Sequence, residues 1–343
     1  MQCTTIGLDV AKNVFQVHGI DSVGRAVVRR RLRRAEVLPF FEGKTPCLVG
    51  LEACASAHHW AREIAKLGHE VRLMPPQYVR PYVKRNKNDA TDAEAICEAV
   101  TRPTMRFVPI KSIDQQAVLM LHRSRDLLIR QRTALVNALR GHFAELGIVV
   151  GQGIWKVAKL VDEVATANLE RVPAIARAVL DVLTSQLGAL QQQIRLLEAE
   201  LLAWHRANAA SQRLATIPGV GPITATAIVA TITSAAQFRS GREFSAWIGL
   251  VPRQHSSGGK DRLGGISKRG DAYLRRLLIH GARTALRWRR AGAVDRSSWA
   301  RGLLERRPPN IVAVAIANKT ARIAWAVLVR DQPYRSPVPA EAA

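Results

Sequence analysis

The first hundred residues alternate between short β-rich runs and helical patterns. Val, Ile, Phe and Thr are concentrated in three runs separated by short turns, which predicts an antiparallel meander over residues 4–10, 14–20 and 26–31. A helical pattern at 35–42 follows, and then a strand, a helix and a strand at 47–51, 57–67 and 70–74. Pro75 and Pro76 end the last strand, because proline cannot donate to a ladder. The pattern predicts an α/β domain.

Helical patterns dominate the middle of the chain. Thr91-Asp92-Ala93-Glu94 has the spacing of a capping box, which predicts a helix from there to about Val100 with Asp92 in its first turn. Longer patterns over 112–147 and 175–206 repeat Leu, Ile and Val every three or four positions. The second carries a stripe suited to a paired helix, in the same chain or in a second protomer: Leu183, Leu187, Leu190, Ile194, Leu197 and Leu201.

Beyond residue 207 the pattern changes to shorter helices around a glycine pair. Gly219 and Gly221 stand between two helical patterns, as in a helix-hairpin-helix, where the backbone N–H groups of a tight turn meet a phosphate. A turn that serves packing alone is the alternative. We expect three regions. Residues 1–105 form an α/β domain with the element order of an RNase H-like fold, 106–206 a helical, coiled-coil middle, and 207–343 a mostly α domain.

The charge of the chain indicates a polyanionic partner. The 343 residues include 51 Lys and Arg against 27 Asp and Glu, a formal net charge of +24, and residues 236–343 alone hold 21 basic and 7 acidic residues, or +14. An excess of this size favours nucleic acid or another anionic surface. The run Arg29-Arg30-Arg31 either tracks a phosphate backbone or forms a solvated strand edge.

The sequence predicts a cytoplasmic protein that does not span a membrane. The N-terminus has no basic region before its first apolar stretch, as a secretory signal would. The apolar segment from Ile311 to Val329 is interrupted by polar and basic residues, Asn318, Lys319 and Arg322. The cysteines show no C-x-x-C spacing, so we expect reduced thiols rather than zinc ligands or disulfides: Cys3, Cys47, Cys54 and Cys97.

Four carboxylates occupy positions typical of metal-dependent phosphodiester chemistry. Asp9 closes the first β-rich run, Glu52 closes the run at 47–51, and Asp89 and Asp92 form a D-x-x-D motif. Strands that end in carboxylates, followed by a helix that carries more, gather acid groups at one sheet edge. Hard cations such as Mg²⁺ or Mn²⁺ prefer these oxygen ligands and bind them alongside substrate phosphates. Simple helix capping is the alternative for Asp89 and Asp92.

A polar, glycine-rich loop at 254–265 carries a second candidate chemistry. Ser256 and Ser257 precede two glycines, and a serine there is a candidate nucleophile for a phosphodiester, with His255 beside it as a candidate general base. Basic residues that could stabilise the developing charge surround it: Arg253, Lys260, Arg262, Lys268 and Arg269. A flexible turn with a solvated serine is the alternative.

Together these segments resemble one family, the bacterial insertion-sequence transposases of the IS110 family, and within it the IS1111 group. The resemblance spans nearly the whole chain, with its motifs in the family's order. In the first hundred residues it rests on Ile6-Gly7-Leu8-Asp9-Val10-Ala11-Lys12, Gly50-Leu51-Glu52-Ala53 and 85–93. In the C-terminal part it rests on Ile217-Pro218-Gly219-Val220-Gly221, Gly249-Leu250-Val251-Pro252-Arg253, Ser256-Ser257-Gly258-Gly259-Lys260 and 264–270.

The resemblance implies a RuvC-like DEDD domain whose metal ligands are Asp9, Glu52, Asp89 and Asp92. It implies a C-terminal transposase domain whose nucleophile is Ser257, the serine directly before the first glycine, with Ser256 one position away. Members resemble one another as DNA recombinases directed by a structured RNA from the element's non-coding end. A composite site in a homodimer or homotetramer, in the bacterial cytoplasm at the nucleoid, is then expected. The alternative is a RuvC-like, structure-specific endonuclease that uses water only.

Overall fold

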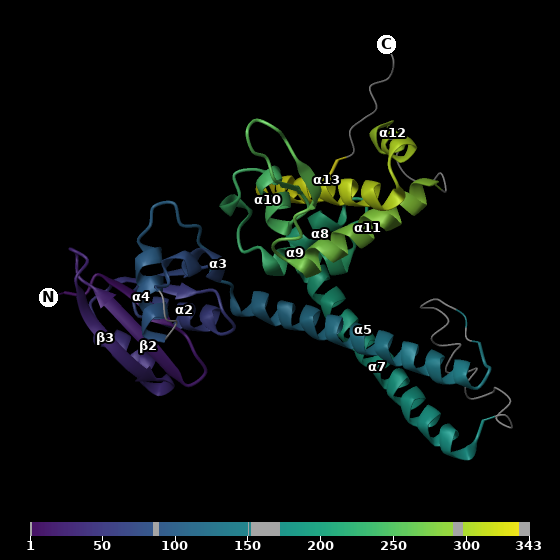
Figure 1. Cartoon of the computed structure of the whole chain (residues 1–343), viewed down its shortest axis with the longest axis horizontal. Coiled ribbons are helices and arrows are strands. Elements are labelled where there is room, and N and C mark those ends of the chain that lie inside the picture. The colour runs from purple at the N-terminus through teal and green to yellow at the C-terminus, as the bar shows by residue number, and fades with distance from the viewer. Residues whose placement is uncertain (1, 85–88, 150, 152–171, 291–297, 336–343) are drawn as a thin grey trace, which may run out of the picture. The chain divides into compact units, whose positions relative to one another are not determined.

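A computed structural model describes residues 2–84, 89–149, 151, 172–290 and 298–335. The chain divides into two compact units, Met1–Ser112 and Ile113–Ala343. Figure 1 shows a sheet with helices in the first unit and an all-helical framework with one small hairpin in the second. The architecture is therefore mixed α/β followed by mostly α, as the pattern of the sequence predicts.

A five-stranded mixed sheet forms the centre of the first unit. Its order is β3-β2-β1-β4-β5. The first three strands pair antiparallel, and β4 and β5 join parallel to β1. The strands are β1 Thr5–Asp9, β2 Val14–Ile20, β3 Ala26–Arg33, β4 Leu48–Glu52 and β5 Glu70–Met74. The predicted meander and the two later strands are confirmed to within two residues.

The two faces of this sheet pack against different helices. Ile6, Leu8 and Phe15 are fully buried on the face covered by α1, Val37–Glu42, and α2, Ala57–Lys66. The opposite face carries α4, Asp89–Val100, whose buried side includes Ala95, Ile96 and Ala99. Short helical turns complete the unit: η1 Arg34–Glu36, α3 Pro76–Val79 and η2 Arg80–Tyr82.

Helix α4 begins two residues earlier than the capping-box prediction. Its first residue is Asp89, so Thr91 lies inside the helix and does not cap it, while Asp92 remains in the first turn as predicted. Residues 85–88 lie outside the described part of the chain. The early start matters for function, because it places Asp89 and Asp92 three positions apart on one helix, where such side chains share a face.

Two long helices of the second unit pack antiparallel on each other (Figure 1). They are α5, Ile113–Glu145, and α7, Ala174–Ala207. Arg125 of α5 donates to Glu198 of α7 at 2.6 Å, and Arg132 donates to Gln191 at 2.9 Å. Leu187 packs in one cluster with residues of α5, so the predicted apolar stripe faces a partner in the same chain. The connection predicted at 151–173 falls almost entirely outside the described residues.

The remaining helices form a core of their own, and α9 connects it to the base of the long pair, where Ala230 packs with Val118 and Leu201. His122 of α5 is buried and hydrogen-bonds Thr226 and Tyr273, both at 3.1 Å. Burial, with a smaller contribution from the nearby Arg125 charge, lowers the pKa of His122 to about 4. The elements are α8 Ala209–Ala215, α9 Pro222–Thr231, η4 Ala235–Gln237, α10 Gly241–Ile248, β6 Pro252–Gln254, β7 Leu263–Ile266, α11 Ala272–Arg290, α12 Ser298–Arg306 and α13 Pro309–Arg330.

Within the described residues, α13 alone has the length and apolar composition of a membrane span. It packs against α10 and α11, and its buried residues, such as Val312 and Ala317, belong to the core of the second unit. This placement is that of a core helix. The four cysteines are free thiols, and three of them are buried. Burial raises the pKa of Cys97 to about 12.

Candidate active site

Three of the four predicted carboxylates lie together at the end of β1. One carboxylate oxygen each of Asp9, Asp89 and Asp92 lies within 4.8 Å of the other two. Asp9 and Asp92 are half-buried and Asp89 is exposed, so the cluster opens toward solvent on one side. The arrangement combines a strand end with the first turn of α4, as the sequence analysis anticipated for acid groups gathered at one sheet edge.

Two glycines allow α4 to lie close enough to the sheet for this cluster to form. A Cβ atom at Gly7 would stand 2.2 Å from the carbonyl oxygen of Ala93 and 2.4 Å from the amide of Cys97. A Cβ atom at Gly50 would stand 2.8 Å from the Cβ of Val100. Gly7 and Gly50 are paired in the parallel register of β1 and β4. The helix therefore lies across two adjacent strands where neither has a side chain.

Strand alternation then places a carboxylate beyond each glycine. Side chains two residues apart share a face of a sheet, so Asp9 lies on the face of Gly7, and Glu52 lies on the face of Gly50. Both are the last residue of their strand. The repeated tripeptide Gly-Leu-acid, at 7–9 and 50–52, is a readable signal for this arrangement.

Glu52 lies beside this cluster without belonging to it. It follows Leu51, the partner of Leu8 in the parallel register, so its position corresponds to that of Asp9 on the neighbouring strand. It is half-buried. The group of mutually close carboxylate oxygens holds Asp9, Asp89 and Asp92, and Glu52 is outside it.

The donor set of the cluster fits a hard divalent cation. An octahedral Mg²⁺ with ligands at 2.0–2.1 Å has ligand oxygens roughly 3 to 4.2 Å apart. Carboxylate oxygens within 4.8 Å of one another approach that spacing without movement of the backbone. The three oxygen ligands leave further coordination positions for water or substrate phosphate, as is usual for Mg²⁺ in phosphoryl-transfer sites.

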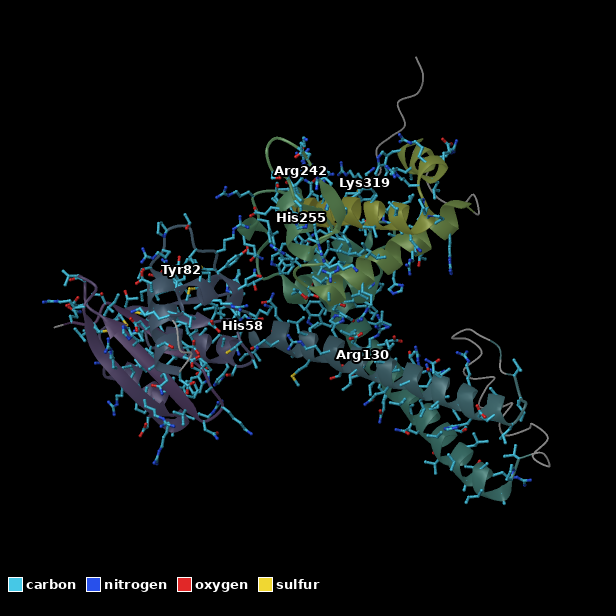
Figure 2. All side chains as sticks on the ribbon, viewed as in Figure 1. His58, Tyr82, Arg130, Arg242, His255 and Lys319 are labelled. Atoms are coloured by element: carbon cyan, nitrogen blue, oxygen red, sulfur yellow. The ribbon has the colours of Figure 1, made fainter. Side chains whose placement is uncertain are left out.

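The predicted serine loop is the tip of a β-hairpin in the second unit. Strands β6 and β7 pair antiparallel, and residues 252–265 are all exposed. Figure 2 labels His255 on this hairpin. Ser257 and Lys260 form a bridge around Gly258 and Gly259, whose φ angles are +57° and +74°. Positive φ at both central positions is the requirement of a type I′ turn, which glycine meets without strain.

The two serines of the hairpin have different surroundings. The Ser256 hydroxyl donates to Asp261 Oδ1 at 3.0 Å and accepts from Gln254 Nε2 at 3.0 Å and from the Arg262 amide at 3.3 Å. These bonds tie the two strands of the hairpin together. The Ser257 hydroxyl makes no hydrogen bond within the described part of the chain. Ser256 is thus a structural link, and Ser257 presents a free hydroxyl at the tip.

The predicted basic residues surround this hairpin and its base. Arg253, Lys260 and Arg262 are exposed on the hairpin itself. Lys268 and Arg269 follow β7 on a segment held against α10. The Lys268 amide donates to the carbonyl of Gly249, and a Cβ atom at Gly249 would lie 2.1 Å from the carbonyl of Arg269. All five cations therefore lie within one short stretch of the second unit that also holds Ser257.

Gly219 and Gly221, the glycine pair of the predicted helix-hairpin-helix, have different surroundings. Gly219 has φ +84°, and its Cβ position lies 2.7 Å from the carbonyl oxygen of Gly281 in α11. Packing therefore accounts for Gly219. Gly221 is the N-cap of α9 and is exposed, and a Cβ atom there would meet nothing within 4 Å among the described residues. Of the two, Gly221 has the open helix N-terminus that phosphate binding needs.

Comparison with known proteins places these features in one family. Residues 6–148, which include all four carboxylates, match the DEDD transposase model of the IS110 elements. Residues 211–296, which include the glycine pair and the hairpin, match the model described as "Transposase IS116/IS110/IS902 family".

Relatives extend the likeness over nearly the whole chain. A probable family 20 transposase of Pseudomonas aeruginosa is 53% identical over 98% of this chain and 99% of its own. The transposase for IS1328 of Yersinia enterocolitica is 44% identical, over 94% of this chain and 96% of its own. The transposase for IS1111A of Coxiella burnetii is 43% identical, over 96% of this chain and 91% of its own.

Proposed function

The chain belongs to the IS110 family of insertion-sequence transposases, enzymes that cut and rejoin DNA, and from that premise we propose a two-part active site. One part is the carboxylate group of the first unit and the other is the serine hairpin of the second. The carboxylate cluster carries the proposal, because one oxygen each of Asp9, Asp89 and Asp92 lies within 4.8 Å of the other two, where a bound cation offsets the repulsion of like charges. The DEDD transposase model that matches this region implies a divalent metal.

In the first part, Asp9, Asp89 and Asp92 hold the metal, which we take to be Mg²⁺ or Mn²⁺. Glu52 completes the set from the neighbouring strand end, after the small side-chain movement that ion binding requires. When bound, the ion neutralises charge on the scissile phosphate and withdraws electron density from phosphorus. The carboxylates also fix where that phosphate lies, since they are carried on a strand end and a helix that two glycine contacts hold in register.

In the second part, Ser257 is the nucleophile. Its hydroxyl loses a proton, for which His255 is the candidate base, and its oxygen forms a bond to phosphorus while one bridging phosphorus–oxygen bond of the DNA breaks; the released sugar oxygen takes up a proton. The phosphoserine link keeps the energy of the phosphodiester for rejoining, which water would discard. The free Ser257 hydroxyl supports this choice over Ser256, whose hydroxyl is engaged in three hydrogen bonds. Arg253, Lys260, Arg262, Lys268 and Arg269 stabilise the developing negative charge.

We also propose the finer architecture. The strand order β3-β2-β1-β4-β5 supports an RNase H-like, RuvC-like fold for the first unit. The α5 and α7 pair is proposed as a coiled coil, and α8 and α9 around Gly221 as a helix-hairpin-helix that binds a DNA phosphate. The three regions 1–105, 106–206 and 207–343 are proposed as the domains.

A guide RNA and a homo-oligomer complete the proposal. The formal charge of +24 leaves room for an RNA in addition to DNA, since the C-terminal stretch 236–343 alone supplies +14. We place the protein in the cytoplasm at the nucleoid and infer that the carboxylates of one protomer act with the serine of another. The guide is tested by omitting the transcript of the element's non-coding end from a reconstituted reaction, which should abolish joining.

The test of the two-part site is formation of the recombined DNA junction, followed by PCR in cells that carry the complete element. We expect Asp9→Ala and Ser257→Ala each to abolish the junction. Glu42→Ala, an exposed carboxylate on α1, is the matched control and should retain it. If Ser257→Ala still gives the junction, the nucleophile is Ser256 or water, and the serine assignment is wrong.

Complementation tests the composite arrangement. Purified Asp9→Ala and Ser257→Ala proteins are mixed, so that a mixed oligomer contains one intact carboxylate group and one intact serine. Joining should return in the mixture, although each protein alone is inactive. Joining that stays absent while the mixed oligomer is demonstrably formed would place both parts of the site in one protomer.

A further inference from the structure

A row of polar side chains runs across the sheet from the carboxylate cluster to its open edge. Asp9 pairs with Gln16 on β2, and Gln16 pairs with Arg31 on β3. Residues directly opposite one another in antiparallel strands share a face, so all three lie on the α4 side. Arg31 is two strand spacings from Asp9, or about 9.5 Å.

A second row runs beside the first. Gly7 pairs with His18, and His18 pairs with Arg29. His18 is only 7% exposed, and its ring makes no hydrogen bond among the described residues. Burial lowers the pKa of His18, so the ring is neutral near pH 7 and keeps one N–H donor.

The two rows line a cavity of about 330 Å³ that reaches the start of α4. Gln16, His18, Arg29 and Arg31 line it on the sheet, and Ala90, Thr91 and Glu94 line it on the helix. Val17 and Arg30, the residues between them on the two strands, also border it, but their side chains belong to the other face of the sheet. Thr91 lies between the two carboxylates of α4. Glu94 is paired with Lys84 at 2.6 Å, which offsets its charge. The cavity therefore carries positive charge toward the sheet edge, and two of its lining residues, Gln16 and Thr91, are neighbours of the carboxylate cluster: Gln16 pairs with Asp9, and Thr91 precedes Asp92.

A plain strand edge would not have this organisation. β3 is an edge strand, and exposed charge on such strands prevents pairing with other chains. That explanation accounts for Arg30, which pairs with Val17 and so lies on the opposite face of the sheet. It does not account for a buried histidine and a glutamine between the arginines and β1, or for the cavity that these side chains line together.

We propose that these two rows bind the phosphodiester backbone of the DNA strand that is cut at the carboxylate cluster. Arg29 and Arg31 contact two phosphates, and Gln16 and His18 donate to oxygens of the intervening nucleotide. A strand that rises 3.4 Å per nucleotide covers the distance from Asp9 to Arg31 in about three nucleotides. We call Gln16, His18, Arg29 and Arg31 the backbone track. The inference rests on the proposed function in one respect, that the DNA is cut at the carboxylates.

The test compares neighbouring arginines that point to opposite faces. Binding of a fluorescein-labelled single-stranded DNA to the full chain is measured by anisotropy at a series of salt concentrations, with Ca²⁺ present. Arg29→Gln and Arg31→Gln should each reduce the slope of log Kd against log salt by roughly 0.7, the value for one phosphate contact on a single strand. The double variant should reduce it by roughly 1.4.

Arg30→Gln is the matched control, because it removes the same charge from the same strand but from the other face. Its slope should equal that of the unaltered chain, and thermal melting should show all four variants folded. The track is refuted if Arg30→Gln reduces the slope as much as Arg31→Gln does, or if none of them changes it.

The junction assay keeps this result separate from the proposed function. An unaltered slope in Arg29→Gln and Arg31→Gln, together with a junction that depends on Asp9, would remove the track and leave the two-part site. Reduced slopes together with a junction that survives Asp9→Ala would leave a DNA track and remove the proposed metal chemistry.

Discussion

The contact of α4 with Gly7 makes a demanding prediction for the substitution Gly7→Ala. The added Cβ would lie 2.2 Å from the carbonyl oxygen of Ala93, whereas ordinary contact begins at 3.4 Å. The helix must therefore move away from β1 by about 1.2 Å, and Asp92, the residue before Ala93, moves with it. Overpacking of a close contact costs about 1–3 kcal/mol. A misplacement of about 1 Å at reacting groups costs on the order of 100-fold in rate.

Two measurements on one protein separate these effects. Thermal unfolding reports the loss of stability, and junction formation in the reconstituted reaction reports the misplaced carboxylates. Gly43→Ala is the control in the same unit, since its Cβ would meet nothing closer than 3.7 Å. We expect that variant to keep both properties. A folded Gly7→Ala protein with unreduced joining would show that the approach of α4 to β1 does not position the carboxylates.

Further predictions concern the second unit. The unfolded chain takes up a proton near the ordinary histidine pKa of about 6.5, whereas buried His122 does so only near 4. Stability should therefore fall as pH drops from about 6.5 to 4, by up to about 3 kcal/mol. Urea unfolding should show a flatter pH dependence for His122→Gln, and an unchanged one would contradict this. Ser256→Ala should keep measurable joining but increase tryptic cleavage of the hairpin; complete loss of joining would instead make Ser256 the nucleophile. Gly281→Ala, whose Cβ would lie 1.9 Å from the carbonyl oxygen of Gly219, should lower the melting temperature by several degrees, while Gly302→Ala should not.

The strands were predictable because each combines a β-rich run with a clear stop. Residues 70–74, for example, end at two prolines, and the structure has the same bounds. The start of α4 was not, because the capping-box spacing at Thr91 also occurs inside a helix that Asp89 begins. Thr91 could cap the helix only if the backbone before it were not helical. The spacing of residues does not show whether that backbone is helical.

Contacts between residues far apart in the sequence could not be predicted from the sequence pattern either. The apolar stripe of α7 predicts that this helix packs against another helix. A helix of the same chain and a helix of a second protomer would both fit that spacing. In the structure the stripe packs against α5. The hydrogen bond from Ser256 to Asp261 depends on the register of a hairpin rather than on any motif. By contrast, the carboxylates at the strand ends were predictable, because Asp9 and Glu52 each close an apolar run; the close approach of α4 to Gly7 and Gly50 comes from the structure.

The contact between Gly219 and Gly281 limits which mutations copies of such an element can accumulate. Each glycine is crowded by the backbone of the other, so a side chain gained at one cannot be accommodated by shrinking the other. A substitution at one of these positions therefore cannot be compensated by a substitution at the other, because glycine is already the smallest residue. In a genome with several copies of the element, a non-glycine at 219 or 281 therefore marks a copy whose transposase is destabilised, even where every active-site carboxylate and serine is intact.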